Sequence, residues 1–207
     1  MNSLKQIKNI PITNNTICGL FPDIVAKNQK VQELKKAGDL IRLKRGLYVV
    51  SPQQSGVAIS TELIANHLYG PSYVSMHSAL HYYGLIPEMV YTMQSMTTKH
   101  SRIFENSLGR FQYISCPASY YNIGLKQIKS GDVQFVMASP EKALCDLIVN
   151  THGLNLRYKK EVLECLEYDF RLDMEAFEKM DPAVFRQCAE VGKKRVTLNL
   201  IAKILER

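Results

Sequence analysis

The chain has 207 residues, of which 46% are hydrophobic and 22% charged, an ordinary globular composition that allows one good core or two small ones. No apolar run approaches the roughly 20 residues that span a bilayer, and residues 1–10 lack the hydrophobic core of a signal peptide. We therefore expect a cytoplasmic protein with no membrane partner.

The net charge of +7 is concentrated near the N-terminus. Residues 1–50 contain nine Lys or Arg and three Asp or Glu, a net charge of +6. A local excess of this kind is typical of a module that binds phosphates, so it predicts an acidic polymer as partner. The five cysteines are odd in number, far apart and without a CxxC pair, which predicts free, buried thiols.

Residues 1–37 predict three helices. A short apolar face at residues 4–10 predicts the first, and Thr13 or Asn14 can cap a second that ends before Pro22. We predict the third over residues 28–37, because apolar residues recur there at three-residue spacing. Gly38 follows at a position where a left-handed residue ends a helix.

The outward face of the third helix carries amide and ammonium groups. At 100° per residue this face contains Asn28, Gln29, Gln32 and Lys36, with Lys35 on the flank. Asn and Gln pair with the major-groove edge of adenine, while Lys suits guanine or phosphate oxygens. The pattern therefore predicts a helix that reads duplex DNA.

A basic hairpin follows at residues 40–50. Ile41 and Leu43 alternate with Arg42 and Lys44, and the tip is Lys44-Arg45-Gly46. An ordinary hairpin with a solvated charged tip is the alternative, but the local charge excess favours a DNA-binding wing. Three helices and a wing make a winged helix-turn-helix. The predicted DNA-binding residues are Asn28, Gln29, Gln32, Lys35, Lys36, Arg42, Lys44 and Arg45.

The polar segment at residues 52–56 predicts a domain boundary. The expected fold class is α+β: a winged helix-turn-helix at residues 1–52, then a mixed α/β domain at residues 56–207 with a small sheet and C-terminal helices. In the second domain we predict amphipathic helices at residues 60–69 and 75–83. Short β-rich runs at residues 90–98, 111–115 and 133–138 predict strands.

Two sets of polar residues in the second domain have the spacing of possible sites. His77 and His81 lie four residues apart, but no third zinc ligand is evident, so we interpret them as surface or capping residues. Lys99, Arg102 and Arg110 lie in or near one strand connection. They could bind an anion or form a solvated basic loop.

ASPEKALCDLIVN at residues 138–150 predicts a helix with Ser139 as N-cap, Pro140 in its first turn and a buried stripe of Ala143, Leu144, Leu147 and Ile148. Together with Asp132 it suggests a nuclease pattern, but the lysine directly follows Glu141, which is the wrong spacing.

Further helices are predicted at residues 158–166, 173–180, 182–191 and 193–205. Residues 193–195 form a second basic cluster that either faces solvent or touches DNA.

Three stretches of the chain resemble the AbiEi-type antitoxins of bacterial type IV toxin–antitoxin systems, also described as AbiEi-family transcriptional regulators. They are LIRLKRGLYVV at residues 40–50, YVSMHSALHYYGLIPE at residues 73–88 and ASPEKALCDLI at residues 138–148. The resemblance covers roughly residues 4 to 150.

The resemblance implies an N-terminal winged helix that represses its own operon through inverted repeats. It also implies a second domain that counters a nucleotidyltransferase-like toxin, without requiring a stable complex with it. Carried onto this sequence, the reading helix falls on residues 28–36 and the wing tip on residues 44–46.

Two classes of function remain open at this point. One is a non-enzymatic DNA-binding regulator and antitoxin, and the other is a nucleic-acid-processing enzyme docked by a winged helix. The sequence contains no recognisable nucleophile–base pair, no GxxxxGK[ST] loop and no metal-ligand cluster, which favours the first. We therefore expect no catalytic residue, no cofactor and no metal site.

Overall fold

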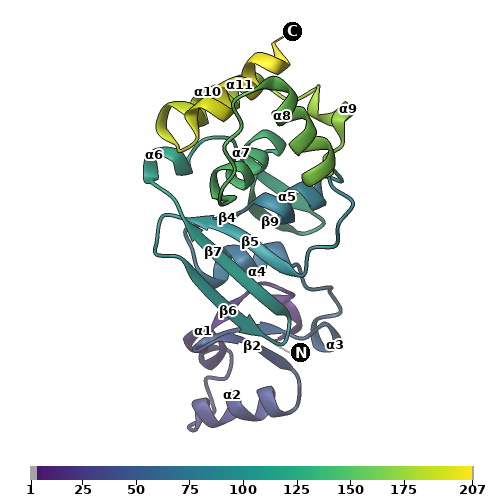
Figure 1. The fold of residues 1–207 in the computed structure, drawn as a ribbon. Coiled ribbons are helices and arrows are strands. Elements are labelled where there is room, and N and C mark those ends of the chain that lie inside the picture. Colours follow the sequence, from purple (N-terminus) through teal and green to yellow (C-terminus); the bar gives the residue numbers. More distant parts are fainter. Residues whose placement is uncertain (1–3, 207) are drawn as a thin grey trace.

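The computed structural model describes residues 4–206 and shows an α+β fold with a three-stranded and a six-stranded sheet (Figure 1). The small sheet and its helices lie at one end of the molecule, and the C-terminal helices lie at the other. The elements at the first end are η1 (Lys5–Ile7), β1 (Ile12–Thr13), α1 (Asn14–Gly19), α2 (Lys27–Lys36), β2 (Leu40–Lys44) and β3 (Leu47–Val50).

The helix boundaries in this region follow local signals. Thr13 caps α1, since its Oγ1 accepts a hydrogen bond from the backbone N of Thr16 at 3.2 Å. The left-handed Gly38, with φ +81°, follows α2 as predicted. The predicted first helix is present only as a single 3₁₀ turn at residues 5–7.

The hairpin β2–β3 contributes to two hydrophobic cores. On one face, Tyr48 and Val50 pack with α1 and α2 residues such as Ile17 and Val31. On the other face, Leu47 and Val49 belong to the core of the second region. Because successive strand residues point to opposite faces, β3 is buried on both sides.

The predicted boundary segment forms a short helix, α3 (Pro52–Ser55), that ends at the left-handed Gly56. Just before it, Ser51 is buried. The hairpin that precedes α3 lies between the two cores and contributes residues to both.

The six-stranded sheet has the order β6-β7-β5-β4-β9-β8. Pairs β4–β9 and β5–β7 are parallel, and the other neighbours are antiparallel. Its strands are β4 (Ser72–Val74), β5 (Thr92–Thr97), β6 (Arg102–Asn106), β7 (Gly109–Ser115), β8 (Leu125–Ser130) and β9 (Val133–Ala138). The three predicted strands correspond to β5, β7 and β9, whereas β4, β6 and β8 were not predicted.

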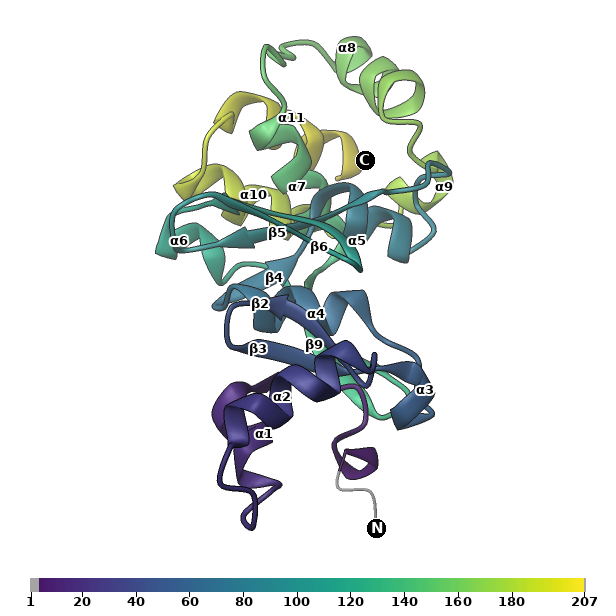
Figure 2. The same ribbon diagram turned by 90° about the horizontal axis from the view of Figure 1, so that it is seen from below.

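Helices cover both faces of this sheet (Figure 2). They are α4 (Thr61–Leu68), α5 (Met76–Tyr82), α6 (Ala118–Tyr121) and α7 (Pro140–Asn150). Successive residues of β4 contact the helices on the two faces of the sheet. Ser72 donates a hydrogen bond to the carbonyl of Ala65 on α4, and Tyr73 donates one to Asp146 on α7. Helix α4 therefore lies between the two sheets, and α7 lies on the far side.

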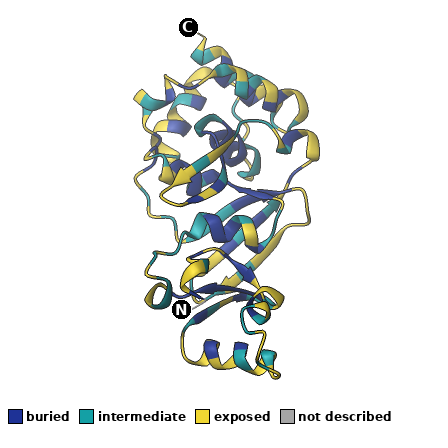
Figure 3. Cartoon of the chain, turned by 180° about the vertical axis from the view of Figure 1, so that it is seen from behind, coloured by how far each residue is buried: buried dark blue, intermediate teal, exposed yellow. Residues whose placement is uncertain are grey.

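The C-terminal helices cover α7 (Figures 1 and 3). They are α8 (Lys159–Glu164) with its π-helical continuation η2 (Cys165–Asp169), α9 (Met174–Phe177), α10 (Pro182–Val191) and α11 (Arg195–Leu205). All four predicted helices are present, most with shorter bounds. The five cysteines are free, and four are buried while Cys18 is partly exposed.

Candidate nucleic-acid interface

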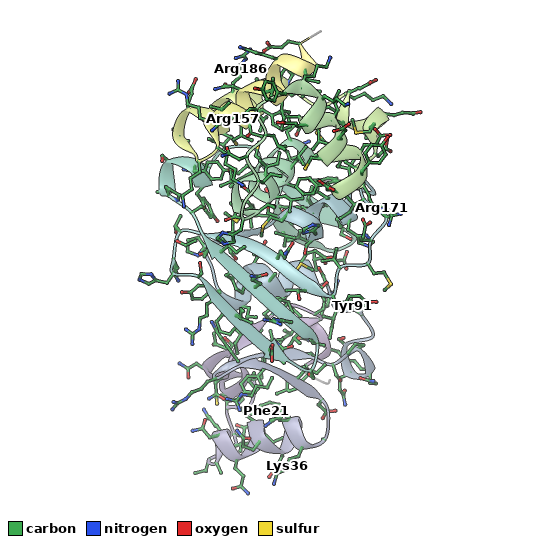
Figure 4. The ribbon with its side chains drawn as sticks, viewed as in Figure 1. Phe21, Lys36, Tyr91, Arg157, Arg171 and Arg186 are labelled. Atoms are coloured by element: carbon green, nitrogen blue, oxygen red, sulfur yellow. The ribbon has the colours of Figure 1, made fainter. Side chains whose placement is uncertain are left out.

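The outward face of α2 has the predicted composition. Val31 and Leu34 are buried, whereas the residues assigned to the opposite face are all exposed. These are Asn28, Gln29, Gln32, Lys35 and Lys36. The predicted helical phase is therefore confirmed for the outward face and for Val31 and Leu34, whereas Ala37, the third apolar residue of the predicted stripe, is exposed. Figure 4 shows Lys36 at the outer end of the molecule.

Asn28 differs from its neighbours because it also holds α1 against α2. Its Oδ1 accepts a hydrogen bond from Asn14 Nδ2 at 3.0 Å. This bond fixes the N-terminal end of α2 relative to α1 and leaves the NH₂ group of Asn28 as the donor for a ligand. Gln29 and Gln32 have no side-chain hydrogen bond within residues 4–206, so their amides are open to an external partner.

Positive charge on this surface is only partly neutralised. Lys30 lies 3.6 Å from Glu33, one turn away on the same helix. Within the described residues, neither Lys35 nor Lys36 forms an ion pair, and the same holds for Arg42 and Arg45, which are exposed on the hairpin. Four cations are thus available to an anionic partner.

Lys44 takes a different position from the one expected at the hairpin tip. Its Nζ donates to the carbonyl of Leu68 at 2.5 Å and lies 5.8 Å from the ring centroid of Phe104. The pairing register shifts between Arg42 and Lys44, an irregularity of the kind that re-aims a side chain. Burial, together with the nearby Lys99 and Arg102, lowers the pKa of Lys44 below its ordinary value. Its ammonium therefore lies against α4 and β6.

A second polar cluster, which the sequence did not predict, is enclosed beneath the sheet. Lys142 and Asp146 are both 0% exposed, and Lys142 Nζ lies 3.3 Å from Asp146 Oδ1. Asp146 Oδ2 accepts hydrogen bonds from Tyr73 at 3.0 Å and Ser75 at 2.6 Å. The Lys142 ammonium also donates to the backbone carbonyl of Tyr120 at 3.0 Å and lies over the aromatic ring of the same residue.

The pKa of Asp146 is raised because burial disfavours its charge more strongly than Lys142 and the hydrogen bonds favour it. Lysine and aspartate one turn apart in an apolar segment are the signal that could have predicted this pair. The buried cluster is a structural network that joins α7 to β4 and α6.

The residues of the rejected nuclease pattern lie apart. Asp132 is exposed at the β8–β9 turn, where it pairs with Lys8. The Oε1 of Glu141 accepts a hydrogen bond from the backbone N of Asp181 at 3.3 Å, while Lys142 faces the core. These three groups do not form one site.

His77 contacts Gln94, with its Nδ1 3.1 Å from Gln94 Oε1. Among residues 4–206, no three His, Cys, Asp or Glu side chains come together in an arrangement that could hold a metal ion. In the same part of the chain, none of the helices has both the length and the apolar character needed to cross a membrane.

Comparison with known proteins supports the fold alone. No protein-family model matches the chain, and no curated protein matches it. Among solved structures it is similar to the RV2827C protein from Mycobacterium tuberculosis, with a TM-score of 0.53 and 10% sequence identity. The likeness covers 97% of this chain and 78% of that one, so it extends across both regions of the molecule.

Proposed function

We propose that the protein binds duplex DNA through a winged helix-turn-helix formed by α1, α2 and the β2–β3 hairpin, and that it represses its own operon. The observation that carries the proposal is the outer face of α2, where exposed amides and unpaired lysines lie opposite the buried Val31 and Leu34. A groove-reading helix needs this combination of base-edge donors and acceptors with phosphate-binding cations. The exposed Arg42 and Arg45 supply further cations on the hairpin.

We further propose that the second region acts as the antitoxin against a nucleotidyltransferase-like toxin. Support comes from the three stretches that resemble AbiEi-type antitoxins. Two of them meet in space, since Tyr73 and Ser75 of the second stretch both donate hydrogen bonds to Asp146 of the third. The resembling residues therefore form one structural network, which is the arrangement expected if the resemblance extends to the fold of this region.

The enzyme alternative has less support. The ionisable cluster around Lys142 and Asp146 is enclosed by the core, whereas a catalytic group must reach its substrate.

The DNA-binding proposal is tested by a salt titration. Full-length protein is titrated by fluorescence anisotropy onto duplexes from its own promoter and onto random duplexes at several salt concentrations. If about six phosphates are neutralised, the log–log slope is about −5. A slope near zero, or no binding at low salt, would remove the proposal.

Gln32→Ala tests whether α2 reads sequence. We expect it to weaken binding to the specific site by about 1–3 kcal/mol and to leave non-specific binding nearly unchanged. Gln53→Ala removes the same exposed amide from α3 and serves as the control. Equal losses on specific and random DNA would contradict a reading role for Gln32.

The same variant separates the two proposed activities in cells. Gln32→Ala is expected to lose repression of a reporter driven by the operon's promoter, yet still protect cells that co-express the neighbouring toxin. Lost repression and lost protection together would show that one surface serves both activities.

A further inference from the structure

Three cations gather where the hairpin meets the six-stranded sheet. They come from β2, from the β5–β6 connection and from β6, and they surround two aromatic rings. Lys44 Nζ lies 5.8 Å and Arg102 Cζ 4.8 Å from the centroid of Phe104, while Lys99 Nζ lies 5.3 Å from that of Tyr69. We call Lys44, Lys99 and Arg102 the cationic cluster.

The rings beneath the cationic cluster form a packed platform. Tyr69 lies 5.5 Å from Phe104 and 5.3 Å from Tyr113, and Phe104 lies 5.8 Å from Tyr113, measured between centroids. Tyr113 is itself fixed, since its hydroxyl donates to the carbonyl of Ala65 at 2.6 Å. Cations over such rings are held by attraction to the aromatic faces, so the cluster sits on a preorganised base.

Both lysines of the cluster are also anchored to backbone at the end of α4. Lys44 Nζ donates to the carbonyl of Leu68 at 2.5 Å, and Lys99 Nζ donates to that of Gly70 at 2.5 Å. An ammonium group has three N–H donors, so each lysine keeps donors for a second partner. The anchoring fixes the position of the two charges without neutralising them.

The charge of the cationic cluster is unbalanced. Within the described part of the chain, none of its members forms an ion pair. The nearby Glu105 lies 3.5 Å from Arg110. Burial lowers the pKa of Lys44, and the neighbouring charges of Lys99 and Arg102 lower it further. Three like charges held close together repel one another, which raises the free energy of the unbound protein. An anion that binds among them relieves this repulsion.

The cationic cluster adjoins the proposed DNA-binding unit. The hairpin turn contacts α1, because the backbone N of Asn14 donates to the carbonyl of Gly46 at 3.0 Å. Strand β6 is tied to β2 by Asn106, whose Nδ2 donates to the carbonyl of Leu43 at 3.2 Å. These contacts join α1, the hairpin and β6. The exposed Arg45 lies in the hairpin turn, between Lys44 and Gly46 in the sequence.

We propose that Lys44, Lys99 and Arg102 form a second phosphate site, which binds the backbone of the same duplex in the DNA flanking the segment that α2 reads. This inference rests on the proposed function and extends it, because it gives the six-stranded sheet a direct part in DNA binding. The alternative is that the two lysines only cap the carbonyls at the end of α4.

The test compares two variants that lose the same charge from opposite edges of the six-stranded sheet. Lys99→Gln/Arg102→Gln removes two cations beside β6, and Lys126→Gln/Lys129→Gln removes two exposed cations from β8. The single variant Arg102→Gln is measured as well, since the Arg102 side chain makes no hydrogen bond within residues 4–206 and its loss leaves the carbonyl anchors of Lys44 and Lys99 intact. Thermal unfolding verifies that each variant is folded.

We expect Lys99→Gln/Arg102→Gln to reduce the salt slope by about 2. The ratio of wild-type to variant affinity should therefore fall about tenfold between about 50 and about 200 mM salt. Arg102→Gln is expected to reduce the slope by about 1, and the β8 control to leave it unchanged. The deficit should be larger on a duplex with long flanks than on one trimmed to the specific site.

Each outcome bears on a different claim. If wild type binds with a steep slope but the β6-side and β8 variants behave alike, the second phosphate site is wrong and the proposed function stands. If wild type does not bind duplex DNA at low salt, both are wrong. A deficit of equal size on trimmed and long duplexes would place the bound phosphates within the specific site and overturn the flanking assignment.

Discussion

Helices α2 and α7 have similar lengths, 10 and 11 residues, but they use lysine in opposite ways. Helix α2 buries only Val31 and Leu34, and its Lys35 and Lys36 face solvent. Helix α7 buries seven consecutive residues, including Lys142, whose ammonium pairs with Asp146. A charge that is paired inside the fold costs stability when its partner is removed, whereas charge left unpaired at the surface is available to an external partner.

The largest expected effect is a loss of stability when the region that contains α7 is separated from the region that contains α2. A fragment of residues 56–207 lacks Leu43, Leu47 and Val49, which are buried in the core of the second region. At about 1.5–3 kcal/mol for each buried side chain, the loss approaches the whole stability of a typical domain. We expect this fragment to aggregate or to bind a hydrophobic dye, as measured by gel filtration and dye fluorescence.

A matched fragment that begins at residue 38 retains the hairpin without α2 and serves as the control. It should expose less apolar surface on the side of the second region, although it uncovers Tyr48 and Val50. A monomeric, cooperatively unfolding 56–207 fragment would show that the second region folds without the hairpin.

The next largest effect tests the buried charge pair. Asp146→Ala leaves the Lys142 ammonium in the core without its carboxylate, and it also removes the acceptor for Tyr73 and Ser75. Breaking a buried pair in this way typically costs about 3–5 kcal/mol, which corresponds to a Tm lower by about 6–20 °C for a chain of this size. Urea and thermal unfolding would measure the change.

The double variant Lys142→Met/Asp146→Leu removes both charges and should lose less stability than Asp146→Ala alone, because no unpaired charge remains. A stability loss below about 1 kcal/mol for Asp146→Ala would mean that the Lys142 ammonium finds water or another acceptor.

The sequence could predict those features of the structure that depend on residues close together in the chain. The exposed face of α2, the left-handed Gly38 and the Ser139 cap of α7 follow from residues within one or two turns, and the structure contains all three. The double burial of β3 also had a signal, the continuous apolar run LYVV. A strand buried on one face alternates, whereas one buried on both does not.

Other features depend on distant parts of the chain. Strand β4 has three residues, and its parallel partner pairs Val74 with Met137, far along the sequence. The buried position of Lys142 arises because β4, α6 and α10 all pack around α7. The displacement of Lys44 requires both the register shift in β2 and the carbonyl of Leu68 on α4. None of these follows from periodicity.

The smallest expected change in stability comes from the lysines of α2. Lys35→Gln/Lys36→Gln removes two exposed charges that have no ion-pair partner within the described residues, so the free energy of unfolding should fall by less than about 1 kcal/mol. The same variant should reduce the salt slope of DNA binding by about 2, since each lysine is expected to contact one phosphate. Lys142→Gln removes a lysine with the opposite role, and we expect it to destabilise the fold strongly by leaving Asp146 without its cation. Unfolding curves and salt titrations on the two variants therefore sharpen the contrast between α2 and α7. A marked loss of stability in Lys35→Gln/Lys36→Gln with an unchanged salt slope would mean that the outer face of α2 stabilises the fold and does not bind a partner.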